Sequence, residues 1–243
     1  MIQTSIKERT RPNWLKIKLD TSGDFIRTRK LMREQSLNTV CEEARCPNIY
    51  ECWGRSTATI MILGDTCTRS CGFCSVKTGR PYVADFEEPM RTAKAVKSMQ
   101  LRHVVITSVD RDDLKEDFGA NIWVETILQI RRLATKCTIE VLTPDFQNFK
   151  PAFEKVFMAA PDIFSHNIEC VKRISREVRP QSDWQRSMSV LKASIEWGLD
   201  TKTGIMVGLG ESDKEVLETM QEAADLGVII FNIGQYLQPT INH

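Results

Sequence analysis

From about Ser56 onward, short runs of apolar β-forming residues alternate with stretches in which apolar positions recur at helical spacing. The apolar runs predict six strands, at Thr59–Leu63, His103–Val109, Thr138–Thr143, Asp162–Ile168, Lys202–Leu209 and Val228–Tyr236. The amphipathic stretches predict helices near Arg91–Met99, Asn121–Thr135, Lys150–Met158, Asp183–Trp197 and Asp213–Leu226. The part before them, Met1 to about Gly54, is polar and predicted to be irregular.

The last predicted helix carries the clearest boundary signals. Its first turn follows a capping box, Ser212-Asp213-Lys214-Glu215, in which the serine and the glutamate can each satisfy a free backbone N–H. Gly227 stands where a helix ends in a left-handed residue. We therefore expect this helix to begin and end at these residues.

Strands that alternate with helices are typical of an α/β fold with parallel strands and right-handed crossovers. Six strands are too few for a closed eight-stranded barrel, and they suit an open partial barrel or a doubly wound sheet. The change from a polar, irregular sequence to alternating strand and helix patterns predicts two parts, an N-terminal extension at 1–55 and an α/β barrel at 56–243.

Polar and cysteine-bearing segments follow most of the predicted strands. Because ligands gather at the carboxyl ends of parallel strands, we expect these segments to meet at one mouth. They are Cys67–Cys74, Ser108–Asp113, His166–Glu169, Gly208–Glu211 and Gln235–Gln238.

Composition and charge exclude some functions. The 243 residues are 42 % hydrophobic and 27 % charged, as in an ordinary globular protein. The net charge of +1 argues against a nucleic-acid partner. Residues 1–40 are locally basic, with nine Lys and Arg against four Asp and Glu. This arm is either a solvated tail or a docking segment for an acidic partner protein.

The chain begins without the apolar run of a signal peptide, and no stretch approaches the roughly 20 apolar residues of a membrane span. We therefore expect a cytoplasmic protein that does not associate with membranes. In that reducing setting, clustered cysteines indicate metal binding more than disulfides.

Six of the eight cysteines fall into two triplets. Cys67, Cys71 and Cys74 have the spacing C-x3-C-x2-C on a loop that leaves the first predicted strand. Three thiolates at such spacing can hold a cubane iron–sulfur cluster, with one iron left open for a ligand. A zinc site and a disulfide framework are the alternatives, although the triplet has no neighbouring fourth Cys or His to complete a zinc site.

The second triplet, Cys41, Cys46 and Cys52, is spaced C-x4-C-x5-C and suggests a second cluster beside the first, or zinc completed from elsewhere. The two single cysteines, Cys137 and Cys170, are expected to be buried thiols that only pack.

The C-x3-C-x2-C triplet with Phe73 before its last cysteine resembles the radical S-adenosylmethionine superfamily. The second triplet and five further segments narrow the resemblance to the lipoyl synthase family, from about Asp24 to Pro239. Those segments are Ala58–Arg69, Val105–Leu114, His166–Glu169, Met206–Glu211 and Ile233–Pro239. The resemblance implies an open, partial (β/α)6 barrel of the TIM type with an iron–sulfur-bearing N-terminal extension.

The resemblance also implies roles for residues. Cys67, Cys71 and Cys74 would hold a reducing [4Fe-4S] cluster whose open iron binds S-adenosylmethionine, which is cleaved to methionine and a 5′-deoxyadenosyl radical. No protein side chain would act as the catalyst. The expected cofactor contacts are Phe73 at the adenine, Ser108 and Asp110 at the methionine amino group, Asn167 and Glu169 at the ribose, and Gly204, Gly208 and Glu211 near the adenine.

By the same resemblance, Cys41, Cys46 and Cys52 would hold an auxiliary [4Fe-4S] cluster that is sacrificed to insert two sulfur atoms, at carbons 6 and 8 of a protein-bound octanoyl group. The implied partners are an octanoylated carrier domain and a reductant such as ferredoxin or flavodoxin. The carrier would belong to the acyltransferase subunit of a 2-oxoacid dehydrogenase or be the glycine cleavage H protein.

The sequence departs from the family pattern near its end. Lipoyl synthases continue with a helix and an Arg-Ser-Ser-Tyr segment, one serine of which completes the auxiliary cluster, whereas this sequence stops at His243. We therefore expect no fourth ligand for that cluster and an exposed sixth strand. An incomplete synthase, an active variant, a protein that cleaves S-adenosylmethionine without inserting sulfur, and a non-catalytic iron–sulfur or zinc-binding module are the alternatives.

Overall fold

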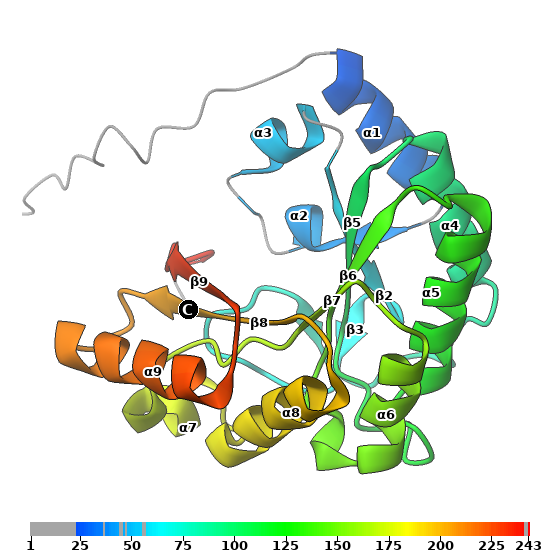
Figure 1. The fold of residues 1–243 in the computed structure, drawn as a ribbon. Coiled ribbons are helices and arrows are strands. Elements are labelled where there is room, and N and C mark those ends of the chain that lie inside the picture. The colour runs from blue at the N-terminus through cyan, green and yellow to red at the C-terminus, as the bar shows by residue number, and fades with distance from the viewer. Residues whose placement is uncertain (1–22, 36, 44–45, 47, 55–56, 241–242) are drawn as a thin grey trace, which may run out of the picture.

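The structure is a computed structural model that describes residues 23–35, 37–43, 46, 48–54, 57–240 and 243 (Figure 1). Its main feature is a seven-stranded sheet in the order β1-β2-β5-β6-β7-β8-β9. The strands are β1 Asn38–Thr39, β2 Thr59–Ile62, β5 His103–Ser108, β6 Thr138–Leu142, β7 Ile163–Ser165, β8 Thr201–Val207 and β9 Ile230–Gln235. All neighbours from β2 to β9 pair in parallel, and β1 pairs antiparallel with β2.

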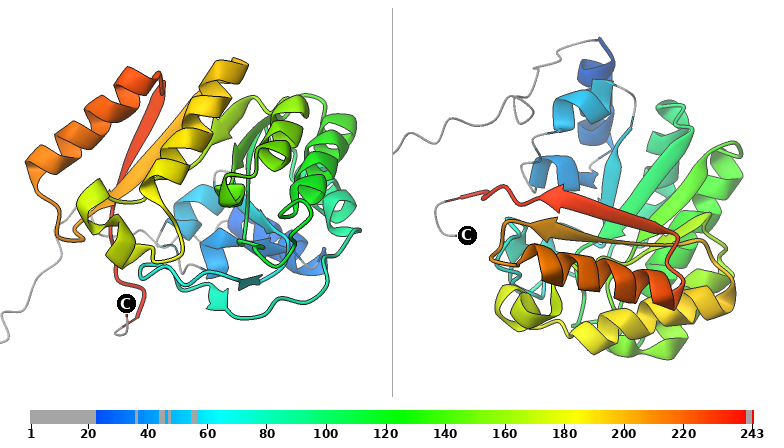
Figure 2. Two further views of the ribbon diagram at one scale, coloured as in Figure 1. Left: turned by 90° about the horizontal axis from the view of Figure 1, so that it is seen from below. Right: turned by 60° about the vertical axis from the view of Figure 1, so that its left-hand side comes forward.

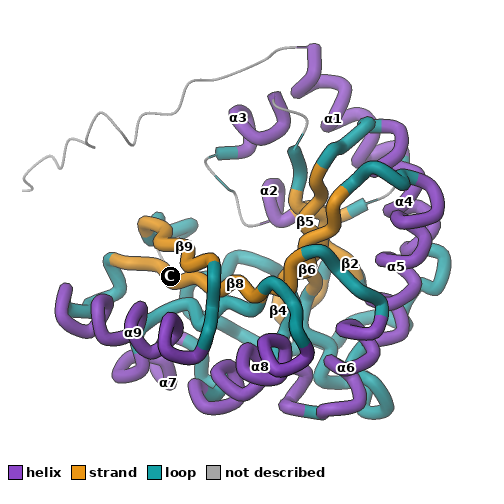
Figure 3. The backbone as a smooth tube through the Cα atoms, viewed as in Figure 1, coloured by secondary structure: helices purple, strands orange, loops and turns teal. Residues whose placement is uncertain are grey.

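Helices cover the outer side of this curved sheet (Figures 1 and 3). They are α4 Glu88–Ser98, α5 Ala120–Leu133, α6 Lys150–Met158, α8 Trp184–Trp197 and α9 Asp213–Leu226. Shorter elements lie in the loops: β3 Thr66–Cys67 pairs with β4 Lys77–Thr78, and η2 Phe146–Asn148, η3 Lys172–Ile174 and α7 Ser175–Val178 follow β6 and β7. Because β1 and β9 are the two edges, the barrel is open, as predicted.

Every predicted strand and helix is present, with boundaries that differ by up to three residues. The predicted helices at Lys150–Met158 and Asp213–Leu226 coincide with α6 and α9. The capping box of α9 forms with both of its hydrogen bonds, and Gly227 ends the helix at φ 107°. These boundaries are local features, which is why the sequence alone locates them.

The N-terminal extension is more regular than predicted. It contains three helices in its described part, α1 Gly23–Glu34, α2 Val40–Glu43 and α3 Ile49–Gly54, together with the edge strand β1. The ring of Phe25 in α1 stacks on Tyr50 at 5.1 Å and lies 5.5 Å from Trp53, both in α3. The extension is thus held by aromatic packing between segments that are distant in sequence, and Phe25, Met32 and Trp53 join the core of the barrel.

The strand at the opposite edge of the sheet, β9, is exposed, as expected for the sixth predicted strand. Within the described residues, β9 pairs only with β8, and Ile233 is 50 % exposed. Figure 2 shows β9 lying at the rim of the open barrel, above α9. Among the helices that the structure describes, none is long and apolar enough to cross a membrane.

Candidate active site

The loop with the first cysteine triplet leaves β2 and is bonded to the carboxyl end of β5. The backbone N–H and the hydroxyl of Thr68 both donate to the carbonyl of Asp110, at 3.0 Å each. In return the N–H of Asp112 donates to the Thr68 hydroxyl at 3.0 Å. Further along the loop, the N–H of Gly72 donates to the carbonyl of Val178 at 2.8 Å. The loop is therefore held against two neighbouring parts of the barrel mouth.

The sulfur of Cys67 lies in a polar setting. It accepts hydrogen bonds from the backbone N–H groups of Asp110 at 3.3 Å and Arg69 at 3.4 Å. Its thiol faces Oδ2 of Asp110 at 3.7 Å. Two N–H donors on one sulfur suit a cysteine that binds iron as a thiolate, because such bonds stabilise charge on the sulfur.

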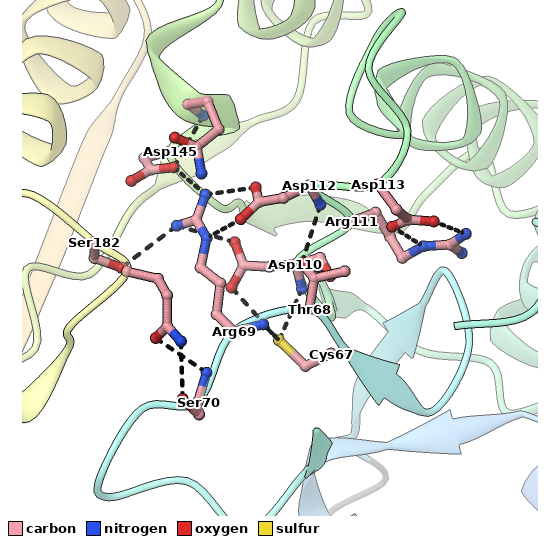
Figure 4. A network of polar contacts seen from close by, with 12 residues as sticks. Cys67, Thr68, Arg69, Ser70, Asp110, Arg111, Asp112, Asp113, Asp145 and Ser182 are labelled. Atoms are coloured by element: carbon pink, nitrogen blue, oxygen red, sulfur yellow. Dashed lines mark hydrogen bonds and ion pairs between the residues drawn. The ribbon is translucent and has the colours of Figure 1, made fainter. Parts of the chain in front are cut away.

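A network of buried and partly buried charges contacts this loop (Figure 4). The guanidinium of Arg69 donates to both carboxylate oxygens of Asp112, at 2.7 and 2.8 Å. It also donates to Oδ1 of Asp145 at 2.7 Å and pairs with Oδ1 of Asp110 at 3.3 Å. Its last contact is with the hydroxyl of Ser182 at 3.4 Å. The network joins the cysteine loop to the ends of β5 and β6.

The electrostatics of the mouth are dominated by burial. Burial, followed by the nearby charge of Asp110, raises the pKa of Cys67 to about 11. Burial likewise raises the pKa of Cys71 to about 12 and that of Asp110 to about 6. Glu169, across the mouth, also has a raised pKa because of burial. Burial thus disfavours the ionised forms of these groups, and a positive charge bound in the mouth would offset that effect.

The residues expected at the methionine end of the cofactor lie at the end of β5. The hydroxyl of Ser108 and Oδ1 of Asp110 are buried and have no hydrogen-bond partner within the described residues, although Asp110 keeps its ion pair with Arg69. Orphaned buried polar atoms at strand ends indicate a place for a polar ligand.

Asn167 and Glu169, expected at the ribose, lie across the mouth after β7, and Gly204, expected near the adenine, lies in β8. The backbone of Glu169 is hydrogen-bonded to β8. Its N–H donates to the carbonyl of Gly204 at 3.0 Å, and its carbonyl accepts from the N–H of Met206 at 2.8 Å. A Cβ on Gly204 would lie only 3.2 Å from Oδ1 of Asn167, so the glycine leaves room that a side chain would fill.

The turn after β8 is closed by Glu211, one of the four residues expected at or near the adenine. The carboxylate of Glu211 accepts from the N–H groups of Gly208 and Leu209, the latter at 2.9 Å. Although burial opposes ionisation, these bonds lower the pKa of Glu211. Gly208 has φ 102°, which favours glycine. Phe73 is half-buried on the loop between Cys71 and Cys74.

The second triplet lies in the N-terminal extension. Cys41 is in α2, Cys52 is in α3, and the N–H of Cys46 donates to the carbonyl of Cys41 at 3.1 Å. Burial raises the pKa of Cys41, and the neighbouring Cys46 adds to that effect. The segments that carry the two triplets are in contact. The hydroxyl of Ser75, which follows Cys74, donates to the carbonyl of Glu43, two residues after Cys41, at 2.7 Å.

The cysteines of the two triplets are the donor type that iron–sulfur clusters use. All eight cysteines lie within the described residues, and none of them forms a disulfide. Over the part of the chain that the structure describes, no three Cys, His, Asp or Glu side chains converge on one point as a single metal ion requires. A cubane places its thiolates on different irons, so its ligands need not converge in this way. Cys137 and Cys170 are 3 % and 0 % exposed, as expected of packing thiols.

Several residues of the mouth were given no role from sequence, although Arg69 and Asp112 lie in segments that were expected there. Arg69, Asp112 and Asp145 form the network described above, and Arg179, which is 6 % exposed, donates to the carbonyl of Ile168 at 2.9 Å. The ring Nε2 of His243 lies 3.0 Å from the carbonyl of Cys74. Only the position of Arg69 between two cysteines could have drawn attention to it.

The fold and the cysteine-bearing mouth define a radical S-adenosylmethionine enzyme, and comparisons with known proteins agree. The family model of the radical SAM superfamily matches residues 61–223. The crystal structure of Streptococcus suis SuiB bound to S-adenosylmethionine superposes with a TM-score of 0.60 at 15 % identity, covering 87 % of this chain and 51 % of that one. Methylornithine synthase (PylB) gives a TM-score of 0.59 at 14 % identity, covering 86 % and 64 %.

The particular family follows from closer relatives. A model of the N-terminal domain of lipoyl synthase matches residues 2–46. The lipoyl synthase of Flavobacterium johnsoniae is 50 % identical over 96 % of this chain and 81 % of its own length. That of Rubrobacter xylanophilus is 54 % identical, over 96 % and 73 %. The chain belongs to the lipoyl synthase family.

Membership of this family makes the chain a radical enzyme that inserts sulfur into a protein-bound octanoyl group, with S-adenosylmethionine and [4Fe-4S] clusters as cofactors. Its substrate is carried on a lipoyl carrier protein. The predictions of family, fold, enzymatic activity and cofactors are therefore confirmed.

Proposed function

We propose that Cys67, Cys71 and Cys74 bind the reducing cluster of this lipoyl synthase family member. The observation that carries the proposal is the attachment of their loop to the end of β5, with two N–H donors on the Cys67 sulfur. When bound, the two clusters and S-adenosylmethionine supply the electron, the radical and the sulfur. The chain itself supplies thiolates, a held loop and a partly buried mouth.

We propose further that S-adenosylmethionine lies across the mouth. Asp110 and Ser108 would accept from its ammonium group, and their unsatisfied oxygens support this. Asn167 and Glu169 would bond the ribose hydroxyls, because carboxylates and amides are good acceptors from sugar hydroxyls. Phe73, Gly204, Gly208 and Glu211 would flank the adenine.

For the extension, we propose that residues 1–55 carry the auxiliary cluster on Cys41, Cys46 and Cys52, and that 56–243 form the barrel. The bond between Ser75 and Glu43 supports this, because sulfur from one cluster must reach a substrate activated at the other. A shared mouth satisfies that requirement.

We propose that the octanoyl carrier is the acyltransferase subunit of a 2-oxoacid dehydrogenase or the glycine cleavage H protein, and that ferredoxin or flavodoxin supplies electrons in the cytoplasm. The basic character of residues 1–40 supports docking of an acidic carrier. The first 22 residues of that arm lie outside the described residues.

The first test is Cys71→Ala after anaerobic reconstitution. Loss of a cluster ligand should abolish cleavage of S-adenosylmethionine and lower the bound iron from about eight to about four per chain. Cys137→Ala is the matched control, because Cys137 is a buried thiol outside both triplets. Cleavage by Cys71→Ala at the rate of the control would disprove the assignment.

The auxiliary site is tested by replacing Cys41, Cys46 and Cys52 together with Ala. Iron should again fall to about four per chain, since one cubane remains. Cleavage of S-adenosylmethionine should persist while sulfur insertion into an octanoylated carrier stops. An unchanged iron content would show that these cysteines hold no cluster.

A further inference from the structure

Arg69 is the third residue of the first cysteine triplet's loop, two positions after Cys67 and two before Cys71. Its side chain is turned inward and the residue is only 3 % exposed. Arginine is almost never buried this far unless it is paired, because removing its charge from water is costly. The loop thus buries a cation at its centre, beside the residues proposed to bind iron.

The acidic partners of Arg69 come from two neighbouring strand ends. Asp110 and Asp112 follow β5, and Asp145 follows β6. Asp112 accepts from Nε and Nη2 at 2.7 and 2.8 Å, while Asp145 accepts from Nη2 at 2.7 Å. The Nη1 atom lies 3.3 Å from Oδ1 of Asp110. Every nitrogen of the guanidinium is engaged, so its position and orientation are both determined (Figure 4).

The backbone of Arg69 is engaged as well. Its N–H donates to the sulfur of Cys67 at 3.4 Å, and its carbonyl accepts from the hydroxyl of Thr78 at 3.2 Å. One residue therefore connects the first cysteine, the strand that follows the loop and the acidic ends of β5 and β6.

We propose that Arg69 is a positioning residue, which anchors the middle of the cysteine loop to β5 and β6 and orients the carboxylate of Asp110 toward the bound amino acid end of S-adenosylmethionine. This inference rests on the roles proposed above for Cys67, Cys71 and Asp110. Arg69 itself touches neither substrate nor iron; it acts through the loop and through Asp110.

The chemistry of the contacts requires arginine. A bidentate bond to Asp112 together with two further carboxylates uses the planar fork of a guanidinium, which a lysine cannot reproduce. An ammonium at the same place would retain the charge but reach fewer of the three carboxylates. Arg69→Lys therefore keeps the positive charge of the site but cannot form the same set of hydrogen bonds to the three carboxylates.

A matched control is available in Arg111, which is also 3 % exposed and lies one residue after Asp110. Its guanidinium bonds to Asp113 at 2.8 and 2.9 Å and to the carbonyls of Leu63 and Tyr82. None of these partners belongs to residues 67–74. Arg111→Lys should disturb a buried arginine to a similar extent without loosening the cysteine loop.

The first measurement is amide hydrogen exchange in the metal-free chain, which needs no cluster. In Arg69→Lys, the N–H groups of Thr68 and Gly72 should exchange at least ~10-fold faster than in the unmodified chain, because local opening becomes easier. In Arg111→Lys these two amides should stay within ~2-fold, and the amide of Leu63 should accelerate instead.

The second measurement is binding to the reconstituted protein. S-adenosylmethionine should bind Arg69→Lys at least ~10-fold more weakly. 5′-Methylthioadenosine, which lacks the amino and carboxylate groups, should bind within ~2-fold of the unmodified chain. A residue that only stabilised the fold would weaken both ligands alike or neither.

The outcomes are separable. If Arg69→Lys matches Arg111→Lys in both the exchange of Thr68 and Gly72 and the selectivity between the two ligands, the inference is overturned. The proposed function is tested separately by iron content and cleavage in Cys71→Ala. If Arg69→Lys fails to fold, Asp112→Asn, which keeps the arginine but weakens its fork, is carried through the same measurements with the same expected results.

Discussion

The buried network at the mouth makes a quantitative prediction for Asp145→Asn. Asp145 is 0 % exposed and accepts from Arg69 at 2.7 Å and from the N–H of Gln147 at 3.0 Å. Burial opposes its ionisation, but Arg69 outweighs burial and lowers the pKa of Asp145. The carboxylate is therefore charged at neutral pH, and asparagine removes that charge while keeping the shape.

The expected loss of stability follows from the ion-pair partners that Arg69 retains in this variant. Removing one partner of a buried ion pair costs about 3–5 kcal/mol. Because Arg69 keeps Asp112 and Asp110, the lower end applies, about 3 kcal/mol. For a chain of this size about 1 kcal/mol corresponds to about 2–4 °C, so the melting temperature should fall by about 6–12 °C.

The assay is thermal unfolding of the metal-free chain, followed by circular dichroism, with Asp85→Asn as control. Asp85 also bonds an arginine, Arg91, at 2.8 Å, but the two side chains are 52 % and 29 % exposed, so their pair is worth less than about 1 kcal/mol. The control should lose about 3 °C or less. A loss in Asp145→Asn no larger than in the control would refute the view that burial gives this network its strength.

Two further predictions concern the barrel mouth and its neighbouring helix. Gly208→Ala would place a Cβ 2.7 Å from Nε2 of Gln235, in a residue with φ 102°, so S-adenosylmethionine should bind this variant more weakly. The control is Gly198→Ala, which has φ 91° and no atom within 4 Å of the added Cβ, and which should lower stability but leave the affinity unchanged. Equal affinities of the two variants for S-adenosylmethionine would contradict the proposed contact at Gly208. For Glu215, the bond to Arg173 lowers the pKa to about 2, so its stabilisation is present above its unfolded value of 4.5 and is lost as pH falls toward 2. Glu215→Gln should therefore lower the melting temperature at pH ~7, and the difference should shrink from pH ~5 to pH ~3; a constant difference would contradict the assignment.

The secondary structure of the barrel was largely accessible from sequence. Helices such as α6 and α9 are marked by apolar spacing and by residues that cap their own ends, which are interactions within one segment. The helices of the extension were missed because α1 has few apolar positions. Phe25 and Met32 of α1 are buried only through contacts with other segments.

The candidate site divides in the same way. The cysteine triplets are visible because their members are close in sequence and their residue type is rare. Two acidic partners of Arg69, Asp112 and Asp145, are 43 and 76 positions away from it in the sequence. Nothing in the sequence distinguishes them from the many charged residues of the chain. Parallel strands bring the ends of β2, β5 and β6 together, and no local pattern records which side chains then meet.

By itself, the sequence determined the order of strands and helices in the barrel and the family, because both depend on periodicity, spacing or residue type. The open barrel and the cysteines suited to bind iron were predicted from the family resemblance. Only the tertiary structure decided that Arg69 is buried under the cysteine loop, that the extension packs as helices on the barrel core, and that Ser75 joins the two cysteine-bearing segments. These features depend on contacts between distant residues, and the energy of burying a charge or an aromatic ring is set by the neighbours that folding supplies.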